Sequence, residues 1–215
     1  MNQDSPQRQG SSDDEGIERI NALSDGVFAI AITLLVLNIE VPNDIPANLV
    51  TQELPGQLAA LVPDLLSYAI SFLVIGSYWM AHRAIFQGIR ALKRGLIWLN
   101  ILFLMFVAFL PFPTALLDEY PNYQLPVALY AGSLAVARLP LTAIWWYATH
   151  NRRLIHEHLD ARTVKLHRIR GLAIPLVFLL SISLSFISTT AAIFSWVLLF
   201  VIDFVVFGVG RLRQE

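Results

Sequence analysis

The chain has 215 residues, of which 56% are hydrophobic and 14% are charged, so it carries too little polar surface for a water-soluble globule of this size. Its formal net charge of −1 gives no indication of nucleic-acid binding, and the absence of cysteine excludes disulfides, thiolate catalysis and cysteine metal sites. We therefore expect an all-α membrane protein whose few charges report its topology.

The N-terminal segment, residues 1–16, is polar and acidic and lacks the basic and apolar regions of a signal peptide, so we expect a disordered tail. The first membrane helix is predicted over residues 19–41. Residues 26–37 are uncharged and almost wholly apolar, and their flanks extend the run to the ~20 residues of a span. Asp25 lies within this helix, where an ionisable group is costly unless it faces protein or water.

Helical periodicity gives this first helix one face of branched aliphatic side chains. With Ile30 at its centre and about 100° per residue, the face contains Leu34, Leu37, Leu23 and Val27, with Gly26 and Thr33 on one shoulder. Such a stripe is typical of a surface that faces lipid or a protein core. Ser24 and Asp25 point elsewhere, toward whatever packs behind the helix.

Beyond this helix, residues 38–57 contain three prolines and no Lys or Arg, which predicts an irregular loop. Pro111 and Pro113 should kink or end the third helix near its far side. The aromatic residues Trp145, Trp146 and Tyr147 are placed for an interfacial belt at the end of the fourth helix. The other membrane helices are predicted over 61–86, 96–117 and 125–148, with two more within 172–209 joined by a hairpin at 188–190.

The distribution of Lys and Arg predicts how the chain crosses the membrane. Fourteen of the fifteen lie in the N-terminal region, in the loops after the second and fourth helices, or at the C-terminus. The positive-inside rule then predicts six transmembrane helices with both termini cytoplasmic, in one domain over residues 17–215. The fifteenth, Arg138, lies inside the fourth helix, at a depth where pairing with Asp203 of the sixth helix is geometrically allowed.

In this topology the second helix runs inward and the third runs outward. His82 and Asn100 then lie within about two turns of the cytoplasmic surface, near the depth of Ser24 and Asp25. They are therefore candidate partners for these two polar residues of the first helix.

Motifs of the common enzyme classes are absent: there is no H-E-x-x-H, no G-x-S-x-G, no glycine-rich phosphate loop and no suitably spaced carboxylate pair. We therefore do not expect an enzyme or a cofactor. The polar segment 150–170 contains four histidines, without a fixed carboxylate or cysteine beside them, which we interpret as surface residues rather than metal ligands: His150, His156, His158 and His167.

Three motifs stand in register on the first three predicted helices. They are Arg19-x-x-x-Leu23-Ser24-Asp25, Trp79-x-x-His82 and the stretch that runs from Leu99-Asn100 through Pro111-Phe112-Pro113 to Leu117. Over about the first 120 residues the chain resembles the endosomal/lysosomal potassium channel family (transmembrane protein 175 type), in particular its single-repeat bacterial members. It departs from the family's R-x-x-x-F-S-D pattern at Leu23, where the family usually has Phe.

The resemblance implies a homotetramer in which ions pass through a narrow pore lined by aliphatic side chains of the first helix. The matching positions are Ile30 for the constriction, Thr33 for a hydroxyl layer that contributes to selectivity, and Leu34 and Leu37 for further hydrophobic layers. It also implies a structural hydrogen-bond network around the Ser-Asp pair, made of Arg19, Ser24, Asp25, Trp79, His82 and Asn100.

Two functions remain open. A channel would surround a shared axis with first helices, whereas a secondary transporter would hold its substrate inside one subunit, with broken helices and internal repeats. The uninterrupted first helix and the lack of an obvious inverted repeat favour the channel, and a T-V-G-Y-G filter is absent. We predict a potassium-permeable cation channel of the bacterial plasma membrane, whose partners are its own copies, the lipid bilayer and monovalent cations. A transporter with an intrasubunit substrate site is the alternative.

Overall fold

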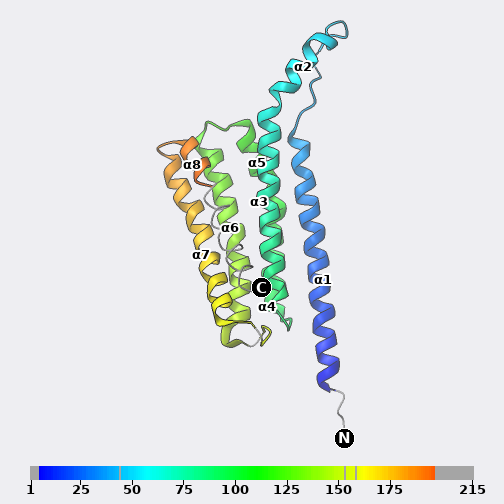
Figure 1. The fold of residues 1–215 in the computed structure, drawn as a ribbon, viewed down its shortest axis with the longest axis vertical. Coiled ribbons are helices and arrows are strands. Elements are labelled where there is room, and N and C mark those ends of the chain that lie inside the picture. Colours follow the sequence, from blue (N-terminus) through cyan, green and yellow to red (C-terminus); the bar gives the residue numbers. More distant parts are fainter. Residues whose placement is uncertain (1–4, 44, 153, 158, 197–215) are drawn as a thin grey trace, which may run out of the picture.

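The computed structural model describes residues 5–43, 45–152, 154–157 and 159–196, and these residues form a bundle of long helices (Figure 1). The α-helices are α1 (Ser5–Leu34), α2 (Val50–Ala60), α3 (Val62–Gln87), α4 (Arg94–Phe109), α5 (Pro111–Glu119), α6 (Gln124–Thr149), α7 (Ala161–Ser185) and α8 (Thr189–Ser195), and two 3₁₀ helices are η1 (Leu35–Asn38) and η2 (His150–Arg152). An isolated antiparallel bridge joins Ile89 and Ile155.

Five helical segments are long and apolar enough to cross a membrane: Asp13–Asn38, Val50–Gln87, Arg94–Glu119, Gln124–Thr149 and Ala161–Ser185. The all-α membrane class is therefore confirmed. Most of the predicted sixth span, together with Asp203, lies outside the described residues. The predicted hairpin is present, because α7 ends at Ser185 and α8 begins at Thr189.

The first helix is longer than predicted at its N-terminal end and shorter at its other end. It begins at Ser5, so most of the segment that we expected to be a disordered tail is helical. Contacts to the turn between α3 and α4 explain part of this extension: the backbone N–H of Leu92 donates to Asp13 Oδ1 at 3.3 Å, and Ile17 packs on the core. At the other end the α-helix tightens into η1, and the backbone is extended at Ile39.

Two other sequence predictions about local structure are corrected. Residues 50–57 belong to α2 and not to an irregular loop, because good helix formers such as Gln52, Glu53 and Leu58 outweigh the single Pro55 inside the helix. The basic residues from Arg162 to Arg170 lie on the first turns of α7 rather than in a loop. The proline break is confirmed, because α4 ends at Phe109 and α5 begins at Pro111, a position where proline is well tolerated.

Of the three residues predicted to form an interfacial aromatic belt, two are exposed at the surface and one is buried. Trp146 and Tyr147 are about half exposed, whereas Trp145 is 2% exposed. The Trp145 indole N–H donates to the carbonyl oxygen of Val164 at 3.2 Å, and its ring lies 5.0 Å from that of His167 on α7. Trp145 is therefore a core residue that joins α6 to α7.

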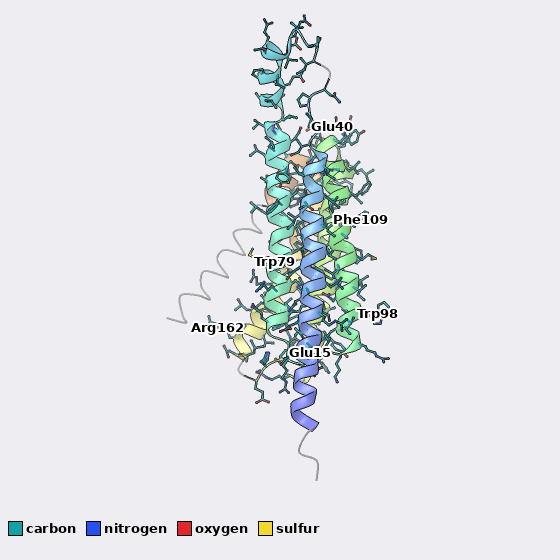
Figure 2. All side chains as sticks on the ribbon, turned by 90° about the vertical axis from the view of Figure 1, so that its right-hand side faces the viewer. Glu15, Glu40, Trp79, Trp98, Phe109 and Arg162 are labelled. Carbon is teal, nitrogen blue, oxygen red and sulfur yellow. The ribbon has the colours of Figure 1, made fainter. Side chains whose placement is uncertain are left out.

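The helix α6 lies at the centre of the bundle, with α7 and α8 on one side and α3, α4 and α1 on the other (Figure 1). Its contact with α7 is close at Gly171, whose hypothetical Cβ would lie 2.8 Å from Thr142 Cγ2. The helix α1 lies at the far edge, in front of α3 and α4 (Figure 2). One side of α1 is thus covered by its own chain and the other side is bare.

Candidate functional site

The buried face of α1 is a stripe of residues at helical spacing that packs on α3 and α4. It consists of Ile20, Ser24, Phe28 and Ala31 of α1 and continues with Leu35 of η1, and none of the five is more than 8% exposed. Four of the five are apolar, so Ser24 is the polar exception within this stripe. Its hydroxyl must find partners inside the bundle.

Ser24, Asn100 and His82 form one chain of hydrogen bonds across α1, α4 and α3. The Ser24 hydroxyl donates to the carbonyl oxygen of Ile20 at 2.8 Å and accepts from Asn100 Nδ2 at 3.1 Å. Asn100 Oδ1 lies 2.8 Å from His82 Nε2. Because that amide oxygen can only accept, His82 must carry a proton on Nε2 and donate it. The direction of every bond in the chain is therefore fixed.

Aromatic rings enclose His82 at the same level. Its imidazole stacks on Phe86 with ring centroids 4.4 Å apart and on Phe103 at 5.5 Å with an interplanar angle of 5°. Phe28 of α1 completes the group, 5.8 Å from Phe103 and 6.2 Å from His82. All four side chains are buried, so water has little access to the hydrogen bonds.

These three phenylalanines are not among the residues of the predicted network, although each lies one helical turn from one of them. Phe28 follows Ser24 by four residues, Phe86 follows His82 by four, and Phe103 follows Asn100 by three. That spacing places each ring on the same helix face as its polar neighbour. It is the sequence signal that would have found them.

Asp25 makes a separate contact on the edge of α1. The indole N–H of Trp79 donates to Asp25 Oδ1 at 2.7 Å, and the Arg83 guanidinium lies 5.6 Å from the centroid of the Trp79 ring. Figure 2 labels Trp79 on α3, beside α1. The candidate network therefore consists of a buried part around Ser24 and an exposed part around Asp25.

Arg19 is exposed and does not join either part. Among the described residues it forms no hydrogen bond or ion pair. The structure thus brings together five of the six residues that the sequence grouped, in two sets, and leaves the sixth, Arg19, exposed toward the N-terminal end of α1.

The four candidate pore residues lie on the bare side of α1. Ile30 is 62% exposed, Leu34 is 40% exposed and Leu37 is 72% exposed, with Leu37 in the 3₁₀ turn η1. Thr33 is also exposed, and its hydroxyl donates within the helix, 2.9 Å from the carbonyl oxygens of Ala29 and Ile30. Because the side chain is exposed, its hydroxyl oxygen can still accept a hydrogen bond from water or approach a cation.

No group of three or more potential metal-binding side chains occurs in the described part of the chain. We expected the four histidines to lie together on one surface loop, but two of them do not. His150 lies in η2, and His167 lies on α7, where it packs on Trp145. His156 lies in the loop, where its backbone N–H donates to the carbonyl oxygen of Gly88 at 3.1 Å, and His158 is outside the described residues.

Residues 19–111 match the family model described as endosomal/lysosomal potassium channel TMEM175. Similar curated proteins include a potassium channel of Streptomyces collinus, 39% identical over 175 residues (79% of this chain and 82% of the relative), and one of Chamaesiphon minutus, 38% identical over 173 residues (79% and 84%). The crystal structure of a lysosomal potassium-selective channel TMEM175 homolog from Chamaesiphon minutus matches with a TM-score of 0.75 and 33% identity, covering 88% of this chain and 97% of that one. All ten candidate residues lie within the matched range.

Proposed function

The chain belongs to the family of the endosomal/lysosomal potassium channel TMEM175, and on that premise we propose that it is a potassium-permeable cation channel of the bacterial plasma membrane. Four copies surround one axis, and the bare face of each α1 lines the pore. Both termini lie in the cytoplasm, so the Asp25 end of α1 forms the inner half of the pore and η1 the outer half.

The observation that carries this proposal is the contrast between the two faces of α1. Ser24 on the buried face is anchored to α3 and α4 by directional hydrogen bonds, which fix the rotation of α1 about its own axis. That rotation directs Ile30, Leu34 and Leu37 away from their own subunit. A row of large aliphatic side chains on the outside of a bundle fits lipid or a subunit partner, and family membership favours the second.

Four Ile30 side chains around one axis form the constriction in this proposal. A ring of branched aliphatic groups excludes water and partly hydrated cations until it widens, so it gates by dewetting. Thr33, one turn farther along, adds a ring of hydroxyl oxygens on the outer side, and Leu34 and Leu37 add further hydrophobic layers. Since the chain has no T-V-G-Y-G segment, preference for potassium has to come from these side chains.

Ser24, Asp25 and their partners have a structural role in this proposal. The hydrogen bonds of Ser24 end on His82 and Asn100, whereas Asp25 is held at the side by Trp79. Neither set includes the Ile30 face. We assign both sets to holding the pore helix in place rather than to binding the permeating ion.

Ion flux from liposomes that contain the purified protein tests the proposal. Potassium, sodium and a bulky organic cation are compared under the same gradient. The channel predicts flux that rises with the gradient, favours potassium and excludes the organic cation. Saturable flux that requires an exchange partner would instead support a transporter with a substrate site inside one subunit.

A further inference from the structure

The face of α7 that points away from the bundle is apolar over most of its length. It carries Ile169, Leu172, Leu176 and Leu179, each between 53% and 57% exposed. In Figure 1 α7 lies at the edge of the bundle opposite α1, so this face is separate from the proposed pore. Exposed aliphatic side chains on a helix that is long enough to span a membrane fit the acyl chains of lipids.

A basic row, made of Arg162, Lys165 and Arg168, continues the same face toward the beginning of α7. The three side chains are exposed and follow one another at intervals of three residues, which places neighbours about 5–6 Å apart at Cβ. At about 100° per residue, Lys165 and Arg168 lie within about 40° of Leu172 around the helix axis. Arg162, which Figure 2 labels near the same end of the bundle as Glu15, lies at the edge of this face. The basic row and the apolar face therefore form one continuous surface.

We propose that the basic row binds the phosphate headgroup of an anionic phospholipid whose acyl chains lie along the apolar face of α7. This inference requires that α7 crosses the membrane, and it does not depend on the pore assignment. Three features support it: the fixed position of Arg168, the lack of competing negative charge, and the length of the apolar face.

Arg168 is held in place by the end of α6. Its Nε and Nη2 atoms donate to Thr149 Oγ1 at 3.3 and 2.9 Å, and Nη2 also lies 3.4 Å from the carbonyl oxygen of Thr149. The Thr149 hydroxyl itself donates to the carbonyl oxygen of Trp145 at 2.7 Å. One edge of the guanidinium is thus fixed against the protein, and no described residue accepts from Nη1, whose two hydrogens can reach a phosphate oxygen. A side chain that is fixed beforehand loses less conformational entropy on binding.

The other two side chains of the basic row have no partner in the described part of the chain. Neither Arg162 nor Lys165 forms a hydrogen bond or an ion pair there. The helix α7 contains no Asp or Glu, and Glu157 of the preceding loop is paired with Arg90 at 3.5 Å. The basic row thus presents its positive charge outward, and each Lys or Arg near a membrane surface adds to the attraction for anionic lipids.

The length of the apolar face matches one leaflet of a bilayer. Leu179 lies 11 residues beyond Arg168, about 16.5 Å along the helix, and half of the hydrocarbon core is about 15 Å. A soluble phosphate would contact only the basic row, whereas a phospholipid contacts the basic row and the apolar face together. This continuity favours a lipid headgroup over a free anion.

Native mass spectrometry of the purified full-length protein in a neutral detergent tests the site. The protein is titrated with phosphatidylglycerol or with phosphatidylcholine of the same acyl chains, and inorganic phosphate is added in excess as a competitor. We expect the parent to bind phosphatidylglycerol at least about tenfold more tightly than phosphatidylcholine, and phosphate to leave the lipid bound. Equal affinity for the two lipids, or displacement of phosphatidylglycerol by phosphate, would overturn the lipid assignment.

A pair of double variants tests whether the basic row is the site. Arg162→Gln/Lys165→Gln should lower the preference for phosphatidylglycerol at least about fivefold. The matched control is Lys93→Gln/Arg94→Gln, which removes the same charge from exposed residues at the beginning of α4 and should keep the parental preference. An equal loss in both double variants, or no loss in the first, would contradict a site on α7.

Arg168→Lys tests the fixed guanidinium. The substitution keeps the positive charge but cannot reproduce the two-atom contact with Thr149 Oγ1. We expect the affinity for phosphatidylglycerol to fall about threefold. An unchanged affinity would exclude Arg168 from the site.

Discussion

The two faces of α1 differ in what surrounds their side chains. On the buried face Ser24 is held by Asn100, which is in turn bonded to His82 within a shell of aromatic rings, whereas on the bare face Ile30, Leu34 and Leu37 are 62%, 40% and 72% exposed. The buried face therefore determines the orientation of α1 within the subunit, and the bare face is the one that we propose for the pore. Substitutions that alter one face at a time should separate the two roles, and those on the buried face should have the largest effect.

Breaking the buried network should have the largest effect on the folded protein. Asn100→Leu keeps the side-chain size but leaves the His82 N–H without its acceptor and removes the donor to Ser24, at about 1–3 kcal/mol for each buried group left unsatisfied. We expect a marked loss of assembled protein on heating, measured by size-exclusion chromatography. Leu172→Ala on the outside of α7 is the control and should behave like the parent. If the Asn100→Leu protein resists heat as well as the parent does, the hydrogen bonds of Asn100 do not stabilise the assembled protein.

Altering the bare face at Ile30 should change conduction more than stability. Ile30→Ala widens the proposed ring and Ile30→Asn makes it polar, so both lower the cost of wetting the constriction. A reduction of the barrier by about 1.4 kcal/mol corresponds to about tenfold more current. Recordings in planar bilayers should give higher conductance and weaker discrimination between potassium and sodium. Parental conductance and selectivity in both variants would place Ile30 outside the pore.

Thr33→Val is expected to have a smaller effect, restricted to ion preference. The substitution keeps the shape of the side chain while removing the hydroxyl oxygen, whose bonds lie within α1 itself. We expect the ratio of potassium to sodium permeability, measured from reversal potentials, to fall. The open probability of the channel should stay at the parental value. Thr33→Ser, which restores the hydroxyl, should retain the ratio, and failure of this rescue would argue against the hydroxyl layer.

Asp25→Asn should have the smallest effect. It removes the charge but keeps an oxygen that can accept from the Trp79 indole, so the expected loss of stability is about 0.5–1.5 kcal/mol. Trp79→Phe, which removes the donor, is the matched change on the other side of the bond. Both variants should keep the parental ion preference in flux assays. An Asp25→Asn protein that assembles normally but selects a different ion would show that Asp25 contacts the ion.

The sequence was most informative where one residue type has one physical consequence. Apolar runs located the membrane helices and Pro111 located the break between α4 and α5. The motif on α1, α3 and α4 predicted that Ser24, His82 and Asn100 meet. Residues with two plausible environments were harder to place. Trp145 belongs to an aromatic cluster typical of an interfacial belt, yet α7 covers it.

Other features depended on tertiary contacts that periodicity does not report. The motif grouped Arg19 with the network, but its place on the exposed side of α1 separates it from His82 and Asn100. The N-terminal extension of α1 relies partly on the contact between Asp13 and Leu92, two residues far apart in the sequence. Such contacts between distant segments override local composition.

A single cysteine on the bare face of α1 tests most directly whether this face lines a water-filled path. In the cysteine-free chain, Ile30→Cys is compared with Leu176→Cys, which is similarly exposed but lies on α7. A charged, water-soluble thiol reagent is added during recording in a planar bilayer. We predict that it blocks current through Ile30→Cys channels and leaves Leu176→Cys channels unchanged. Unchanged current in both, although mass spectrometry detects the modified cysteine, would contradict the claim.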